Sequence, residues 1–305
     1  EVYDKIVDLR RGQVEAKQSP PRAADRFQSL IENSNPYERD SGSRMNWAAG
    51  LNVPVAQEGE SIDLLYWIGC AGSFDPDGQS VSRAMVKILN HLKIPYRLLG
   101  KRERCNGDPA RRLGEEGLFH ELAMANLETL EVHSVKHVLT HCPHCFNVFK
   151  NEYPQLRNVR FDVEHHSQFL ARMLNEGRLN LTSAIDAKLT FHDPCYLGRG
   201  NGDTHSPRQV LAKIPKAQMI EMPRHGKESF CCGAGGGSLW LDVPGNERVE
   251  NLRCAEAASS GASTVVTGCP FCRTMLEAGR QALDNETSVK QTMDLAELIV
   301  KAMGL

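Results

Sequence analysis

The chain has 305 residues, of which 41% are hydrophobic and 24% are charged, and its formal net charge is −2. At roughly 150 residues per domain this length predicts two domains, and the balanced charge excludes a basic surface that holds nucleic acid through its phosphates. Apolar runs are much shorter than the ~20 residues that span a bilayer, and no export signal is visible.

We expect residues 1–61 to form a helical lead-in rather than a domain, because they contain too few apolar residues for a core of their own. The amphipathic pattern of Glu1–Lys17 predicts one helix, and a second is expected over Ala23–Ile31. Residues 33–42 are rich in Asn, Ser, Pro and charge, which predicts a loop. Because the chain begins without Met, we expect a fragment or processed product, with any membrane anchor in an absent segment.

Beyond residue 61 the sequence repeats itself with an offset of about 126 residues. Four anchor points agree between the copies, which indicates a tandem duplication with a first cysteine-rich unit at 62–187 and a second at 188–305. The matching segments are Cys70 with Cys195, Cys105-Asn106-Gly107 with Cys231-Cys232-Gly233, Cys142-Pro143-His144-Cys145 with Cys269-Pro270-Phe271-Cys272, and His165–Leu170 with Asp294–Ile299.

Each unit alternates short apolar runs with amphipathic segments, a pattern typical of α/β units with mostly parallel sheets. Strands are predicted at 63–69, 136–140, 159–163, 188–192 and 263–267, and helices at 79–93, 112–130, 144–152, 166–177, 246–260, 270–281 and 293–303. Ligands of such sheets lie beyond the carboxyl ends of the strands, and several cysteines directly follow predicted strands.

The ten cysteines are the strongest chemical signal in the sequence. A long chain without an export signal favours metal ligation over disulfides. Nine cysteines fall into two groups, whereas Cys254 lies in a helical pattern and is expected to be a core residue. The first group is Cys70, Cys105, Cys142 and Cys145, and the second is Cys195, Cys231, Cys232, Cys269 and Cys272.

The two groups differ in what they can bind. Five thiols exceed the four that a cubane or a tetrahedral zinc site requires, which favours an iron–sulfur cluster in the second unit. In the first unit Asn106 stands where the second has Cys232. Its four thiols suit a cubane [4Fe–4S] cluster or zinc, and an empty site is the third alternative.

Histidines near these cysteines are secondary candidates. His165 and His166 open a predicted helix after a strand, where one of them could protonate a substrate or quinone; the alternative is a capping or core role. His141, His144 and His192 flank ligand cysteines, so they either tune a cluster by hydrogen bonds to sulfur or fill the strand ends.

The spacing of the second unit, C-x(35)-C-C-G-x(35)-C-x-x-C, resembles the cysteine-rich "CCG" domain pair of heterodisulfide reductase B subunits. Similarity is closer to iron–sulfur subunits resembling electron-transfer-flavoprotein:quinone oxidoreductase. It is carried by Tyr66–Gly72, Cys105–Arg112, Cys142–Asn147 and His192–Arg199. The resemblance implies a non-cubane [4Fe–4S] cluster on Cys195, Cys231, Cys232, Cys269 and Cys272, whereas Asn106 departs from the motif in the first unit.

The resemblance also implies a function. We expect an iron–sulfur oxidoreductase subunit of a larger complex, which passes electrons between a flavoprotein or ferredoxin-type clusters and a quinone or disulfide acceptor. Its expected location is the cytoplasm, at the inner face of the membrane through a partner or an absent segment. The alternative is a zinc-binding structural or assembly subunit whose thiols never change redox state.

Overall fold

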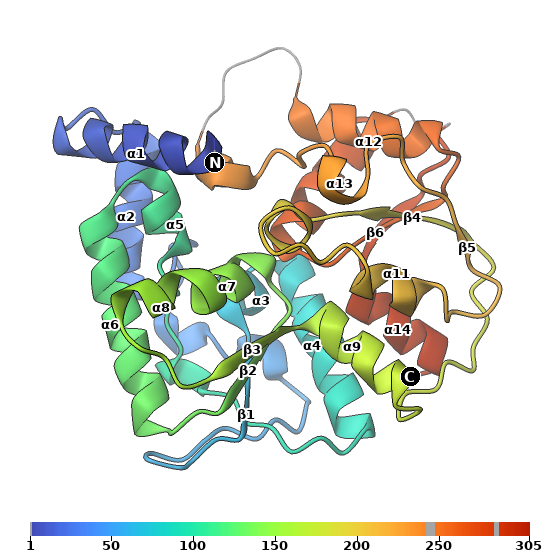
Figure 1. Cartoon of the computed structure of the whole chain (residues 1–305), viewed down its shortest axis with the longest axis horizontal. Helices are drawn as coiled ribbons and strands as arrows, with labels where there is room; N and C mark the ends of the chain where they lie inside the picture. The colour runs from blue at the N-terminus through green and yellow to red at the C-terminus, as the bar shows by residue number, and fades with distance from the viewer. Residues whose placement is uncertain (1, 242–247, 284–286) are drawn as a thin grey trace.

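The computed structural model describes residues 2–241, 248–283 and 287–305. Two N-terminal helices, α1 (Val2–Glu15) and α2 (Pro21–Asn33), precede the two cysteine-rich units and contact helix α5 of the first unit (Figure 1). Pro21 occupies the first turn of α2, where its fixed φ suits a helix start and its missing N–H costs no hydrogen bond. The predicted helical lead-in is therefore present. Helix α1 ends two residues earlier than expected, and α2 extends two residues beyond each predicted end.

In the first unit, helices alternate with three strands. Its elements are β1 (Leu64–Trp67), α3 (Gly69–Phe74), α4 (Pro76–His91), α5 (Asp108–Leu113), α6 (Glu116–Val132), β2 (His137–Thr140), α7 (Pro143–Asn147), a π-helical turn (Val148–Glu152), α8 (Tyr153–Leu156), β3 (Asp162–His165) and α9 (His166–Asn175).

The described part of the second unit repeats this order around four strands. Its elements are β4 (Lys188–His192), α10 (Cys195–Gly198), α11 (Ser206–Leu211), β5 (Gln218–Met219), α12 (Val249–Ser259), β6 (Thr264–Thr267), α13 (Pro270–Ala282), β7 (Gln291–Asp294) and α14 (Leu295–Met303).

Three strands follow the same order in both sheets, and the second sheet has β5 as an additional edge strand. The first has the order β1-β2-β3 and the second β5-β4-β6-β7, and every pairing between these strands is parallel. β4, β6 and β7 thus occupy the positions of β1, β2 and β3. This confirms the predicted α/β class with parallel sheets. The carboxyl ends of the strands within each sheet share one edge, which brings together cysteines that are far apart in the sequence.

The units lie beside each other and share apolar interiors (Figure 1). One core cluster joins Val81, Ile88 and Leu89 of α4 to Leu295 and Ile299 of α14. Helix α13 also contacts α4, and α9 contacts α11. Apolar burial therefore links the units directly, rather than leaving each with a closed core of its own.

Most predicted elements exist, with three corrections. The strand predicted at 159–163 is β3 at 162–165, and the helix predicted at 144–152 becomes a π-helical turn after α7 ends at Asn147. The helix predicted at 293–303 begins at Leu295, because 291–294 form strand β7. Residues 246 and 247 of the helix predicted at 246–260 lie outside the described residues.

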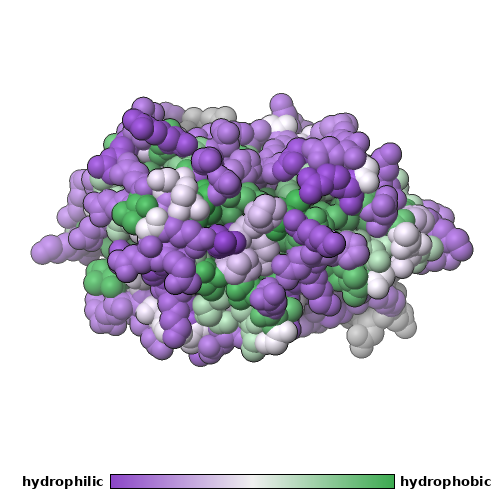
Figure 2. Space-filling model, turned by 90° about the horizontal axis from the view of Figure 1, so that it is seen from below, coloured by the Kyte–Doolittle hydropathy of each residue, from purple (hydrophilic) through white to green (hydrophobic). Residues whose placement is uncertain are grey.

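Surface polarity agrees with the composition. Figure 2 shows one face that is mostly hydrophilic, with apolar residues in separate patches. Among the helices of the described ranges, none combines the length and apolar character that crossing a bilayer requires.

Candidate metal centres

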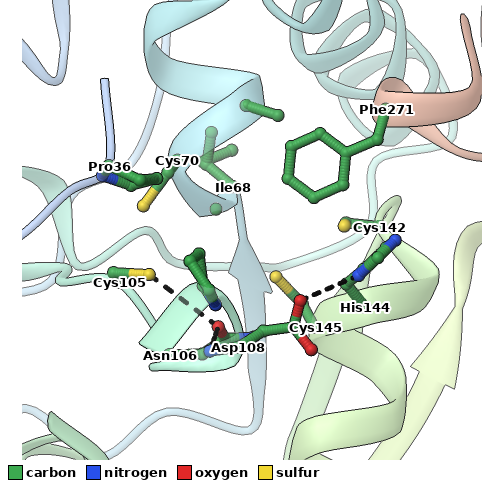
Figure 3. Close-up of a pocket in the computed structure, with 13 residues that line it drawn as sticks. Pro36, Ile68, Cys70, Cys105, Asn106, Asp108, Cys142, His144, Cys145 and Phe271 are labelled. Atoms are coloured by element: carbon green, nitrogen blue, oxygen red, sulfur yellow. Dashed lines mark hydrogen bonds and ion pairs between the residues drawn. The ribbon is translucent and has the colours of Figure 1, made fainter. Parts of the chain in front are cut away.

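The four cysteines of the first unit line one pocket. Cys70 lies on α3 just after β1, Cys142 follows β2, and Cys145 lies on α7, while Cys105 comes from the loop before α5. Figure 3 shows their sulfur atoms around a common space, with Asn106 at its floor and the Phe271 ring above it. All four side chains are buried free thiols. The structure thus brings together the complete first group.

Contacts between these thiols favour a negative charge on one sulfur. Hydrogen bonds link Cys70 to Cys105 and Cys142 to Cys145. Burial by itself would raise the pKa of Cys70, but the bond from Cys105 and the nearby Arg44 guanidinium lower it below its usual value. Arg44 lies 3.7 Å from the Cys70 sulfur and is ion-paired with the buried Glu103 at 3.2 Å. Arg44 is thus a buried cation that stabilises thiolate, and local sequence spacing did not reveal it.

Two backbone features fit this pocket to a cluster. Gly69 has φ +74°, and a Cβ atom there would lie 3.2 Å from the Cys145 sulfur, so glycine permits the chain to pass close to the sulfur atoms. Asn106 is buried, and its Oδ1 accepts a hydrogen bond from the Asp108 amide at 3.0 Å. Its Nδ2 has no hydrogen-bond partner among the described residues. A sulfur-rich group in the pocket would supply an acceptor for this buried N–H donor.

The five cysteines of the second unit also converge. Cys195 begins α10, Cys269 precedes α13 and Cys272 lies within it, and the Cys231-Cys232 pair comes from the loop before α12. Hydrogen bonds link Cys232 to Cys231 and Cys272, and Cys272 to Cys269. The bonds from Cys231 and Cys272 lower the pKa of Cys232 well below its usual value despite its burial. Hydrogen bonds therefore connect four of the five thiols, and they favour an ionised sulfur at Cys232.

A tight turn lets the adjacent cysteines share this site. Gly233 has φ +100°, a conformation that suits glycine, and its N–H donates a hydrogen bond to the Cys231 sulfur at 3.2 Å. Cys232 points inward and is buried, whereas Cys231 is exposed. The turn at Gly233 thus places the two sulfur atoms in different environments.

His192 belongs to the second site itself and does not merely flank a ligand cysteine in the sequence. Its ring nitrogen and the sulfur atoms of Cys232 and Cys272 all lie within 4.8 Å of one another. The buried Arg253 guanidinium donates to His192 Nδ1 at 3.0 Å. The Arg253–His192–Cys232 chain therefore places a cation behind the second site, as Arg44 does at the first.

The central residue of each Cys-Pro-x-Cys turn reaches the opposite site. Phe271 lines the pocket of the first-unit thiols, while His144 is hydrogen-bonded to Cys269 of the second. His144 Nδ1 is also 2.8 Å from Asp108 Oδ2. Burial would raise the pKa of Cys269, but bonds from Cys272 and His144 lower it to about 6. The two sites are thus in contact through these two side chains.

The other three candidate histidines form a buried network between the units: His141, His165 and His166. His165 Nε2 lies 3.1 Å from the Gly268 carbonyl oxygen, and His166 Nε2 lies 3.0 Å from Asp294 Oδ1. The Tyr66 hydroxyl is 2.8 Å from His141 Nδ1. His165 and His166 are fully buried, and the role predicted for them stays a prediction. Cys254 is buried apart, with its thiol 3.0 Å from the Leu276 carbonyl oxygen.

The donor sets fit iron–sulfur ligation. Cysteine thiolates are the usual ligands of such clusters. The first site offers four converging thiols and an unpaired amide donor, and the second offers five thiols, one more than tetrahedral zinc can use.

Comparison with known proteins identifies the family. The family model described as "Cysteine-rich domain" (CCG) matches residues 64–150 and 189–277. The chain is 37% identical over 99% of its length to the "Probable iron-sulfur-binding oxidoreductase FadF" of Bacillus subtilis, covering 44% of that protein. It is 36% identical over 98% of its length to the "EtfAB:quinone oxidoreductase" of Syntrophomonas wolfei, covering 43% of it.

A third relative is shorter. The chain is 33% identical over 92% of its length to one subunit of the dihydromethanophenazine:CoB–CoM heterodisulfide reductase of Methanosarcina barkeri, and covers 68% of that subunit. The chain thus spans less than half the length of the first two relatives. With two CCG matches over more than half its length, the chain belongs to the CCG cysteine-rich domain family, together with iron–sulfur oxidoreductase and heterodisulfide reductase subunits.

Proposed function

We propose that the chain is an electron-transfer module that carries two [4Fe–4S] clusters and passes electrons between a flavoprotein or ferredoxin-type clusters and a quinone or disulfide acceptor. The main support for this proposal is the contact between the two groups of cysteines. Nine cysteines form two thiol sites that meet through His144 and Phe271, and such proximity suits electron transfer between two centres.

The proposed ligands follow the two groups. Cys195, Cys231, Cys232, Cys269 and Cys272 would hold a non-cubane [4Fe–4S] cluster, and Cys70, Cys105, Cys142 and Cys145 a cubane one. These sites belong to a first unit at 62–187 and a second at 188–305. When bound, such clusters supply one-electron redox chemistry, at a potential set by burial and by hydrogen bonds to sulfur.

The protein's own residues would set that potential. Arg44 lies near Cys70, and Arg253 reaches Cys232 through His192. His144 adds a hydrogen bond to Cys269 and is held by the Asp108 carboxylate. Positive charge and N–H donors beside sulfur stabilise the more negative, reduced state of a cluster, so these groups are expected to raise both potentials.

Partners and location are part of the proposal. The name of the Syntrophomonas relative contains both EtfAB and a quinone, which supports an electron-transfer flavoprotein as donor. The Methanosarcina relative's name supports a disulfide as an acceptor. Quinones are lipid-soluble, so a quinone acceptor would place the module at the cytoplasmic face of a membrane, held there by a partner or a further segment.

Metal analysis tests the proposal. We expect anaerobically purified protein to contain about eight iron atoms per chain, the sum of two four-iron clusters. Cys142→Ala and Cys269→Ala should each lose about half of the iron. Cys254→Ala is the matched control, because Cys254 is a buried cysteine outside both sites, and it should keep all of it. One or two zinc ions and no iron would establish the structural alternative instead.

A further inference from the structure

A cavity of about 370 Å³ lies against the second site. Its wall includes Cys195 and Cys231. Of the ten cysteines, these two alone are not buried, Cys195 being partly exposed and Cys231 more fully so. The first-site thiols are buried, so the two cysteines that solvent and small molecules can reach both line this cavity.

Three arginines line the cavity, and two of them make it positive. Arg112 is ion-paired with Asp108 and Glu152, so its charge is largely neutralised. By contrast, Arg10 donates to the main-chain oxygens of Arg112 and Gly236, and Arg199 donates to those of Lys227 and Ser229. Neither forms an ion pair with a carboxylate among the side chains that the structure describes, so both charges remain available to a ligand.

Apolar groups also line the cavity. Helix α1, which carries Arg10, contributes Ile6 and Val7, and the Tyr196 ring lines it as well. A guanidinium presents several N–H donors in a planar fork that matches carboxylate and phosphate oxygens. The cavity therefore combines an anion-binding end with an apolar surface.

We propose that this cavity binds a small organic anion, whose carboxylate or phosphate group is held by Arg10 and Arg199 and whose apolar part contacts α1. The ligand would lie beside Cys195 and Cys231, which makes the cavity the entry to the second site for a substrate. This role in substrate access rests on the proposed function, whereas anion binding itself does not.

Calorimetric titration of the anaerobically purified protein tests this inference. The probes are benzoate and phenylphosphate, with the neutral benzyl alcohol as a control for apolar binding alone. We expect at least one anion to bind and benzyl alcohol to bind much more weakly. Comparison of the two anions distinguishes a carboxylate site from a phosphate site. Losing one charged hydrogen-bond partner should weaken binding by about tenfold or more.

Arg199→Gln and Arg10→Gln should both show this loss, and either variant suffices if the other misfolds. The matched control is Arg160→Gln, since exposed Arg160 lines a different cavity that contains no cysteine. A bound anion should also change the EPR spectrum of the second site in wild type. Equal affinity in wild type and both cavity variants, or equal binding of benzyl alcohol, would overturn the inference. Absence of iron with anion binding retained would overturn the proposed function alone.

Discussion

His144 and Phe271 occupy equivalent positions in the two Cys-Pro-x-Cys turns, yet only one can donate a hydrogen bond. Burial alone would lower the pKa of His144, but the Asp108 carboxylate and the Cys269 sulfur raise it well above its usual value. The ring therefore brings a positive charge to the second site. This asymmetry predicts that the two centres differ in potential.

Replacing His144 with Phe tests this asymmetry. Because a donor to the Cys269 sulfur is lost, the potential of the second centre should fall by on the order of 60 mV, the one-electron equivalent of about 1.4 kcal/mol. Redox titration followed by EPR measures it. His137→Gln is the control, since His137 pairs with Glu164 away from the thiols. An unchanged potential in His144→Phe would contradict the tuning role.

A second prediction concerns the adjacent pair Cys231 and Cys232. Cys232→Asn recreates in the second unit the Cys-Asn-Gly sequence of Cys105–Gly107. Four thiols remain, enough for a cubane cluster, so iron content should change by less than about one quarter while the non-cubane EPR signature disappears.

Iron analysis and EPR spectra of wild type, Cys232→Asn and the Cys254→Ala control check this outcome. An unchanged spectrum in Cys232→Asn would show that Cys232 is not a ligand. Wild type and variant that both hold zinc without iron would refute the electron-transfer proposal.

Two strand–helix junctions, β3–α9 and β7–α14, meet at the boundary between the units. His165 ends β3 and caps α9 in a capping box with Gln168, and Asp294 ends β7 and caps α14 in the same way with Glu297. His166 and Asp294 then join the two helix starts by a 3.0 Å contact. Burial lowers the pKa of His166 to about 3 and raises that of Asp294 to about 6.

The lowered histidine pKa predicts acid sensitivity. An unfolded His titrates near ~6.5, so the unfolded state binds more protons than the native one, and His166 costs stability as the pH falls from about 6.5 towards 3. Asp294 has the opposite sign, since its raised pKa favours the native state below about 6. His166→Gln removes only the first effect.

We expect His166→Gln to be less stable than wild type at pH 7.5, because buried hydrogen bonds are lost. That difference should shrink by roughly 1 kcal/mol per pH unit between about pH 6.5 and 4. Denaturant unfolding at several pH values measures it, with the exposed His120→Gln as control. Parallel pH profiles for wild type and His166→Gln would refute the assignment.

At the scale of the whole molecule, the units are equivalent in topology but not independent in packing. β1-β2-β3 corresponds to β4-β6-β7, yet both core clusters draw residues from each unit. Residues 62–180 and 188–305 should therefore superpose as two similar units, while neither should be stable alone.

Calorimetry tests this coupling. The 305-residue chain should unfold in a single transition, because separating the units exposes the α4–α14 contact to water. A separate fragment of residues 1–187 should show little cooperative unfolding and should aggregate. Two well-resolved transitions in the full chain, or a fragment that melts like the whole, would show that the units fold independently.

Much of this architecture was predictable from the sequence. Repeated cysteine spacing indicated the duplication and the two thiol groups, and periodicity located β1, β2, β4 and β6 to within a few residues. Strand β7 was missed because it has four residues and runs directly into α14 at Asp294 without a loop. The match of Asp294 with His165, which is the last residue of β3, was the signal that could have revealed it.

Cysteine spacing is enough to assign the thiols to two groups, because the cysteines of one unit follow strands whose carboxyl ends share an edge. The groups that surround those thiols are visible in the folded chain and not in the spacing. Arg44 and Arg253 approach the two sites from distant segments, and His144 of one unit reaches Cys269 of the other. The His144 contact depends on how the two units pack together, and the Arg44 and Arg253 contacts depend on segments distant in the sequence that fold against each site. Local cysteine spacing carries no information about either.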